Sequence, residues 1–157
     1  MKTLFPLGDQ AMSIFKKILV PTDGSDASER AVQAAVQFAK ESGSSLVGLS
    51  VAEDIVQWAV IDGTAINYLQ VENEILENAK SNVARLAALA KSADVPCETF
   101  TVKAVHPYEE ILAHASRQHC DAIFMASHGR KGLERFILGS QTQKVLANAT
   151  IPVLVFR

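Results

Sequence analysis

Two glycines and a serine near the end of this 157-residue chain have the residue types and spacing of an anion site. Nine residues separate Gly129 from Gly139, and Ser140 follows directly. Glycine lets the backbone approach a ligand closely. The helical pattern that begins after Ser140 would present the unpaired N–H groups and partial positive charge of a helix N-terminus. Arg130 and Lys131 add positive charge nearby, and this combination favours phosphate as the ligand.

A purely structural interpretation of the same stretch stays open. Ser140 and Gln143 have the spacing of a capping box, in which case Gly139 would only end the preceding turn. The stretch is not a Walker A loop, since no Gly-Lys-Ser/Thr follows the glycines, and it is not GxGxxG either. Spacing alone therefore leaves a helix cap and a phosphate site as alternatives.

A second polar loop, Pro21-Thr22-Asp23-Gly24-Ser25, follows the first apolar run of the chain at 16–20. By residue type and position alone Asp23 is a turn residue, because aspartate before glycine is ordinary turn chemistry. Asp26, with Glu29 three residues later, is the predicted cap of the helix that follows.

Apolar runs and helical patterns alternate along the chain. The predicted strands are 16–20, 45–51, 98–103, 122–126 and 152–156, and the predicted helices start near 26, 64, 107 and 140. This alternation predicts an α/β protein with a single doubly wound, five-stranded parallel sheet and four helices. Ligands of such sheets bind at the carboxyl ends of the strands, where the strand order reverses. If the first strand lies beside the fourth, the loops 21–24 and 126–132 flank that point.

The long helix, predicted over about 64–92, carries an apolar stripe that we expect to face the core. The stripe consists of Leu69, Leu76, Ala79, Val83, Leu86 and Ala90. Trp58 lies in a predicted loop before this helix. Residues 1–12 are predicted to be a loose extension that precedes one domain at 13–157.

Composition excludes several classes of function. The formal net charge of −2 gives no basic surface for nucleic acid, and no apolar run approaches the ~18 residues that span a membrane. The two cysteines do not form a disulfide framework, which favours a cytoplasmic protein with reduced thiols. His114 and His119 lie about 140° apart on a helix, so they do not predict a metal site. No Ser-His-Asp or Cys-His arrangement can be argued.

The chain resembles the universal stress protein family over about 15–157. The resemblance rests on ILVPTDGS, HPYEEI, SHGRKGLERFILGS and IPVLVF. The family's nucleotide signature is Gly, two residues, Gly, nine residues, Gly and then Ser or Thr. Gly129, Gly139 and Ser140 match it, whereas Ala126 stands at the first glycine. A glycine at that position would either permit a positive φ or let the backbone lie close to the ligand.

The resemblance implies a sheet of order 3-2-1-4-5, a homodimer formed through the last strand, and a bound adenine nucleotide, ATP or AMP, with Mg²⁺. Asp23 would bind the ribose or lie near the nucleotide's metal ion, and Val51, at the end of the second strand, would meet adenine through its backbone. The full implied set of binding residues is Pro21, Thr22, Asp23, Val51, Ala126, His128, Gly129, Arg130, Gly139, Ser140 and Gln141.

Three functional hypotheses follow. The first is a nucleotide-dependent regulator of the stress response, in which ligand occupancy changes shape or partner. The second is an interaction module of the same fold that binds no nucleotide, with Ala126 as the mark of lost binding. The third and weakest is a slow ATP hydrolase, for which the sequence offers no evident general base.

Overall fold

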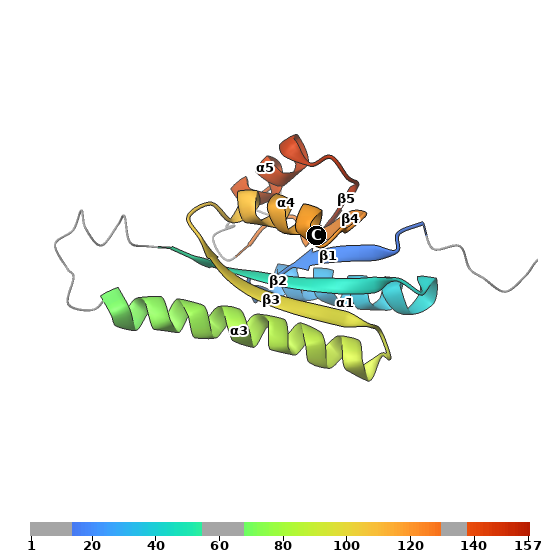
Figure 1. The fold of residues 1–157 in the computed structure, drawn as a ribbon, viewed down its shortest axis with the longest axis horizontal. Coiled ribbons are helices and arrows are strands. Elements are labelled where there is room, and N and C mark those ends of the chain that lie inside the picture. The colour runs from blue at the N-terminus through green and yellow to red at the C-terminus, as the bar shows by residue number, and fades with distance from the viewer. Residues whose placement is uncertain (1–13, 55–67, 130–137) are drawn as a thin grey trace, which may run out of the picture.

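The computed structural model describes residues 14–54, 68–129 and 138–157. Its centre is a parallel five-stranded sheet of order β3-β2-β1-β4-β5 (Figure 1). The strands are β1 Lys17–Pro21, β2 Ser45–Glu53, β3 Cys97–Ala104, β4 Ala122–Ala126 and β5 Val153–Phe156. The predicted fold class and strand order are therefore confirmed.

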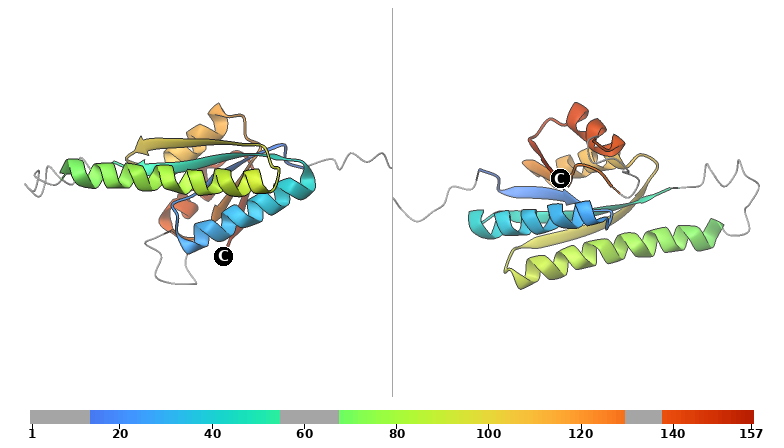
Figure 2. Two further views of the ribbon diagram at one scale, coloured as in Figure 1. Left: turned by 90° about the horizontal axis from the view of Figure 1, so that it is seen from below. Right: turned by 180° about the vertical axis from the view of Figure 1, so that it is seen from behind.

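The described helices cover the two faces of the sheet in pairs. They are α1 Asp26–Ser42, α3 Tyr68–Ser92, α4 Pro107–Arg117 and α5 Ser140–Asn148. Figure 2 shows α1 and α3 on one face, with α4 and α5 on the other. Successive strand residues alternate between the two sides: Ile18 and Val20 pack with α1 and α3, and Leu19 packs with α4 and α5. This alternation follows from the two-residue period of a strand.

Two helix starts differ from the prediction. The cap of α1 is Ser25, not Asp26, because Ser25 has extended backbone angles and its Oγ accepts a hydrogen bond from the Ser28 N–H at 3.2 Å. The capping box at Ser140 is also wrong. Gly139 is the cap of α5 and, having no side chain, makes no side-chain cap bond. The Gln143 side chain donates instead to the Leu138 carbonyl.

Two further expectations need correction. Strand β2 continues to Glu53, because its residues pair with β3 as far as Ala104, the last residue of β3. Val51 therefore does not end β2. Leu69 does not belong to the buried stripe of α3, because its side chain is 71% exposed. Figure 1 gives the reason: the first turns of α3 extend past the end of β3.

Several predictions fall on residues outside the described ranges. They are the extension at 1–12, the start of the long helix at 64, the Trp58 loop, and Arg130 and Lys131. Among the helices of the described ranges, none combines the length and the apolar character that a membrane span requires.

Candidate functional site

The candidate site lies at the carboxyl edge of the sheet, which we define as the ends of β1 and β4 with the loops that follow them, 22–25 and 127–129. Strand β1 is central and pairs with both β2 and β4, so the chain order reverses between β1 and β4. Ligands of open parallel sheets bind at this kind of position. The predicted location of the switch point is confirmed.

Asp23 and Gly129 meet across this edge. A Cβ atom built on Gly129 would lie 2.4 Å from Asp23 Oδ2, well inside van der Waals contact. The positive-φ glycines of the described ranges are Gly24 and Gly43, so backbone conformation does not explain Gly129. A side chain at position 129 would therefore have to displace the Asp23 carboxylate.

The loop after β1 fixes the direction of the Asp23 carboxylate. Its Oδ1 accepts hydrogen bonds from the Ser25 N–H at 3.0 Å and from the Ser25 hydroxyl at 2.6 Å. Behind it, the buried Thr22 Oγ1 accepts from the Gly24 N–H at 3.2 Å and lies 3.1 Å from Ser28 Oγ. These two hydrogen bonds to one oxygen set the orientation of the Asp23 carboxylate.

Gly139 closes the loop between β4 and α5. Its N–H donates to the Ser127 carbonyl at 2.7 Å, and a Cβ on Gly139 would lie 3.1 Å from the Cα of His128. The start of α5 is thereby held against the loop that carries Gly129. Gly129 and Gly139 both let a neighbouring group approach the backbone closely, and neither has a positive φ.

Thr142 adds a connection that the sequence analysis missed. Its side chain is 3% exposed, and its hydroxyl donates to the Ala126 carbonyl at 2.9 Å. This bond ties the first turn of α5 to the last residue of β4. A hydroxyl residue three positions after Gly139, in the first turn of a predicted helix, was the available sign.

The first turn of α5 therefore points its N–H groups toward the carboxyl edge. Ser140 is the first residue of the helix and is exposed, as a residue facing a ligand would be. These N–H groups lack intrahelical acceptors and carry the positive end of the helix dipole. The side chain of Gln141 has a different partner, since its Oε1 accepts from the Tyr108 N–H at 3.0 Å and so caps α4.

Ala126, the departure from the family signature, is not strained. It ends β4, and the non-glycine residues with positive φ in the described ranges are Asp94 and His119. Its methyl group packs with Ala27 and Ala31 of α1. A requirement for positive φ therefore does not explain a glycine at this position.

The other residues of the binding set that the resemblance implies are Pro21, Val51, His128 and Arg130. Pro21 is the buried last residue of β1, and Val51 is half-buried and packs on the α4 and α5 side of the sheet. His128 Nδ1 lies 3.0 Å from Ser127 Oγ. Arg130 is outside the described ranges. Within those ranges, no group of three or more His, Cys, Asp or Glu side chains could hold a metal ion.

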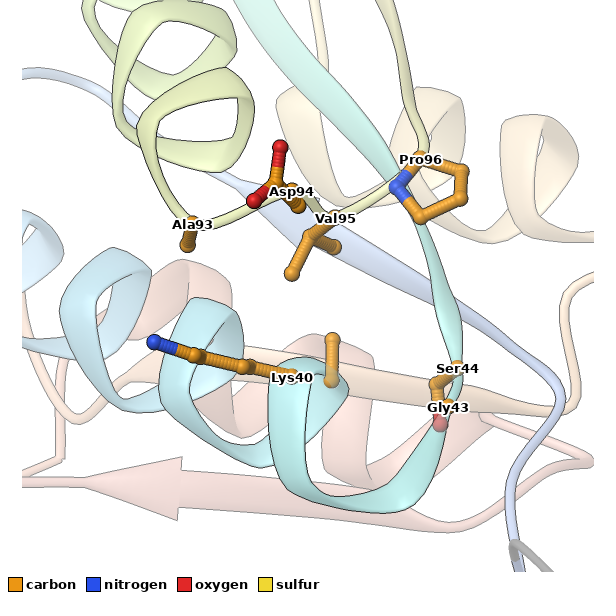
Figure 3. Close-up of a pocket in the computed structure, with 8 residues that line it drawn as sticks. Lys40, Gly43, Ser44, Ala93, Asp94, Val95 and Pro96 are labelled. Atoms are coloured by element: carbon orange, nitrogen blue, oxygen red, sulfur yellow. The ribbon is translucent and has the colours of Figure 1, made fainter.

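A cavity of about 310 Å³ lies at the opposite, amino edge of the sheet, between the ends of α1 and α3 (Figure 3). Its lining residues are Ala39, Lys40, Gly43, Ser44, Ala93, Asp94, Val95 and Pro96. Gly43 ends α1 there, with a φ of 74° and its N–H bonded to the Ala39 carbonyl. The cavity shares no residue with the carboxyl edge, and its polar backbone groups serve to end helices.

Comparison with known proteins gives consistent results. A model of the universal stress protein family matches residues 14–157. The chain is 35% identical to the universal stress protein YxiE of Bacillus subtilis, with 92% of this chain and 100% of YxiE covered. It is 30% identical to the universal stress protein MJ0531 of Methanocaldococcus jannaschii, with coverages of 92% and 84%.

Solved structures agree with these matches. MJ0577 of Methanocaldococcus jannaschii superposes with a TM-score of 0.75 at 28% identity, covering 92% of this chain and 96% of MJ0577. A universal stress protein in complex with cAMP gives a TM-score of 0.60 at 25% identity, with coverages of 90% and 95%.

Proposed function

Because the chain belongs to the universal stress protein family, we propose that it binds an adenine nucleotide, ATP or AMP, at the carboxyl edge of the sheet. The observation that carries this proposal is the contact between the Asp23 carboxylate and Gly129, beside the first turn of α5. One side of the site offers a fixed acceptor and the other offers backbone donors at a positive helix end. A nucleotide, with sugar hydroxyls and a phosphate, matches both sides.

The charges suggest how the ligand lies. Phosphate oxygens would accept hydrogen bonds from the backbone of Gly129, Gly139 and Ser140, where the dipole of α5 favours an anion. Asp23 is itself a carboxylate and repels bare phosphate. It therefore contacts either ribose hydroxyls, which donate to it, or an Mg²⁺ ion that the phosphates bring.

The base would lie toward Val51, whose strand β2 is the other neighbour of β1. A backbone contact at Val51 suits adenine, because a base edge can pair with backbone N–H and carbonyl groups without a charged partner. The related protein in complex with cAMP supports an adenine ligand of this family. Binding of the nucleotide would then act as the signal in a stress response, by changing the shape of the protein or the partner that it binds.

The proposal is tested on the purified protein. Nucleotide released on denaturation is identified by mass spectrometry, and ATP·Mg²⁺ and AMP are then titrated by calorimetry. We expect micromolar affinity for at least one of them and binding weaker by about a hundredfold or more in Gly129→Val. No released nucleotide and no heat at millimolar concentrations would instead favour the interaction module that binds no nucleotide. Turnover of bound ATP would favour the slow hydrolase.

We also propose a homodimer formed through β5. This strand pairs with β4 on one side, and Leu154, at its middle, is 43% exposed. A second copy pairing edge to edge would cover both the open strand edge and the leucine. Leu154→Lys should therefore convert a dimer to a monomer in light-scattering measurements, and a wild-type monomer at all concentrations would contradict the proposal.

A cytoplasmic location is proposed from the thiols. Cys97 and Cys120 are both free, and burial raises the pKa of each thiol to about 11, so neither is poised to form a disulfide. Cell fractionation tests this point, and recovery in an oxidising compartment would contradict it.

A further inference from the structure

A polar cluster on α3 contacts the loop that carries Asp23. The cluster consists of Asn82 and Arg85, with Ser50 of β2 and Glu29 of α1 as their partners. Helices α1 and α3 lie on the same face of the sheet (Figure 2). The proposed nucleotide contacts do not include any member of this cluster.

Gly24 is where the cluster meets the loop. It has a φ of 75°, and a Cβ built on it would lie 2.3 Å from Asn82 Oδ1 and 2.9 Å from Arg85 Nη2. Gly24 separates Asp23 from Ser25, the residue that holds the Asp23 carboxylate. A displacement of Gly24 would therefore move both the backbone from which the Asp23 side chain extends and the Ser25 groups that orient its carboxylate.

Asn82 is held firmly enough to act as a support. Its side chain is 5% exposed, its Nδ2 donates to Ser50 Oγ at 3.3 Å, and its Oδ1 accepts from Arg85 Nη2 at 3.1 Å. Ser50 is 1% exposed and directly precedes Val51. Because both ends of the buried amide have partners, Asn82 joins the two segments that carry the proposed ribose and base contacts.

Arg85 extends the support to α1. Its Nη2 and Nε donate to Glu29 Oε1 at 2.8 and 3.2 Å, and its side chain is half exposed. Glu29 lies in the first turn of α1, directly after the loop. The guanidinium therefore joins α3 to the start of α1 and lies close to Gly24 of the loop.

We propose that Asn82 and Arg85 are positioning residues, which hold the 22–25 loop so that Asp23 meets Gly129 in the arrangement that binds ligand. The proposal rests on the proposed nucleotide function for its effect on affinity. Its effect on the loop is independent of any ligand. This difference allows the two proposals to fail separately.

The test compares Asn82→Ala with Asn78→Ala, an exposed asparagine one turn earlier on the same helix. Affinity for ATP·Mg²⁺ is measured by calorimetry well below the melting temperature. We expect about tenfold weaker binding in Asn82→Ala, the size of effect that loss of one buried polar partner produces, and unchanged binding in Asn78→Ala. Asn82→Asp keeps an acceptor for Arg85 and offers a second one to the Ser50 hydroxyl, so it should recover most of the affinity.

Amide resonances of the ligand-free proteins give the second readout. The Asp23, Ser25 and Gly129 amides should shift in Asn82→Ala and stay in place in Asn78→Ala. If Asn82→Ala does not fold, Arg85→Met, at a half-exposed position, takes its place with the same expected direction. Unmoved loop amides, or an affinity equal to that of Asn78→Ala, would overturn the proposal. If wild-type protein binds no nucleotide, the function proposed above falls, and the loop amides alone decide the positioning role.

Discussion

At the carboxyl edge of the sheet, Gly129 and Gly139 lack a positive φ but have close neighbours where a Cβ would lie, whereas at the amino edge Gly43 has a φ of 74° and open space around it. A Cβ on Gly129 would collide with Asp23, and one on Gly139 would press on His128. A Cβ on Gly43 would meet nothing within 4 Å. One edge uses glycine to bring backbone and carboxylate together, and the other uses it to end a helix.

The same difference separates the cavity at the amino edge from the candidate site. The cavity lies where α1 and α3 end, and it is lined by residues at those ends. At the carboxyl edge, the hydrogen bonds of Ser25 fix the Asp23 carboxylate within its own loop, and those of Gly139 and Thr142 hold α5 against the end of β4 and the loop that follows it. Binding groups that are already fixed lose little entropy when a ligand arrives.

The largest expected effect is on binding at Gly129. The side chain in Gly129→Val would displace the Asp23 carboxylate and push the backbone donors away from the phosphates. We expect affinity for ATP·Mg²⁺ to fall by about a hundredfold or more, equivalent to the loss of about two strong polar contacts. Calorimetry measures this change, and an affinity within threefold of wild type would show that the contact is not part of the site.

Gly24 combines the properties of both edges, so its substitution should cost the most stability. In Gly24→Ala, the left-handed backbone costs about 1 kcal/mol, and the collision with Asn82 adds about as much again. In an Asn82→Ala background the collision with Oδ1 is gone, so the cost should fall, and the remaining close contact is the one with Arg85 Nη2. Chemical denaturation of the four proteins of this cycle measures the coupling. Additive effects would mean that Asn82 does not press on the loop.

Gly43→Ala is the matched substitution at the amino edge. The φ of Gly43 nearly equals that of Gly24, but its surroundings are open. It should therefore cost only the backbone term of about 1 kcal/mol and leave nucleotide affinity unchanged. Weaker nucleotide binding in this variant would break the distinction between the two edges.

His114 offers a change in stability that involves neither edge. Its side chain is 4% exposed against Phe100, its Nε2 has no hydrogen-bond partner among the described residues, and burial lowers its pKa below the ordinary 6.5. The folded state therefore binds the proton less readily than the unfolded chain does. Stability should be complete above pH 6.5 and decline as the pH falls below it. Denaturation at pH 7.5 and 5.5 measures this decline, and His114→Leu should flatten it; an equal slope in both proteins would assign the pH dependence elsewhere.

The smallest expected effect on binding among substitutions at the carboxyl edge is that of Ala126→Gly, which restores the family signature. The Ala126 methyl group packs on α1 and its backbone is extended, so its removal creates no new approach for ligand. Affinity should change by less than about threefold, while stability falls by about 1 kcal/mol through a lost buried methyl and a more flexible chain. A large gain in affinity on calorimetry would show that the methyl group obstructs the site.

The sequence predicted the fold well because several of its strands, such as 122–126, are continuous apolar runs and are separated by clear helix starts such as Pro107. The strand order came from the family resemblance rather than from these patterns. Caps at Ser25 and Gly139 were missed by one residue, since adjacent polar residues differ only in the backbone angles that they adopt. Asn82 was missed because its partners are brought together only by tertiary packing. A sign was present, since Asn82 is a polar residue on the apolar stripe between Ala79 and Leu86.

The central claim, that the carboxyl edge is the ligand site, is tested most directly by a nuclear magnetic resonance titration of ATP·Mg²⁺ into the ligand-free protein. The amides of Asp23, Gly129, Gly139 and Ser140 should shift together and saturate, while those of Lys40, Gly43 and Asp94 around the cavity stay in place. Shifts confined to the cavity, or no saturable shifts at millimolar nucleotide, would contradict the claim.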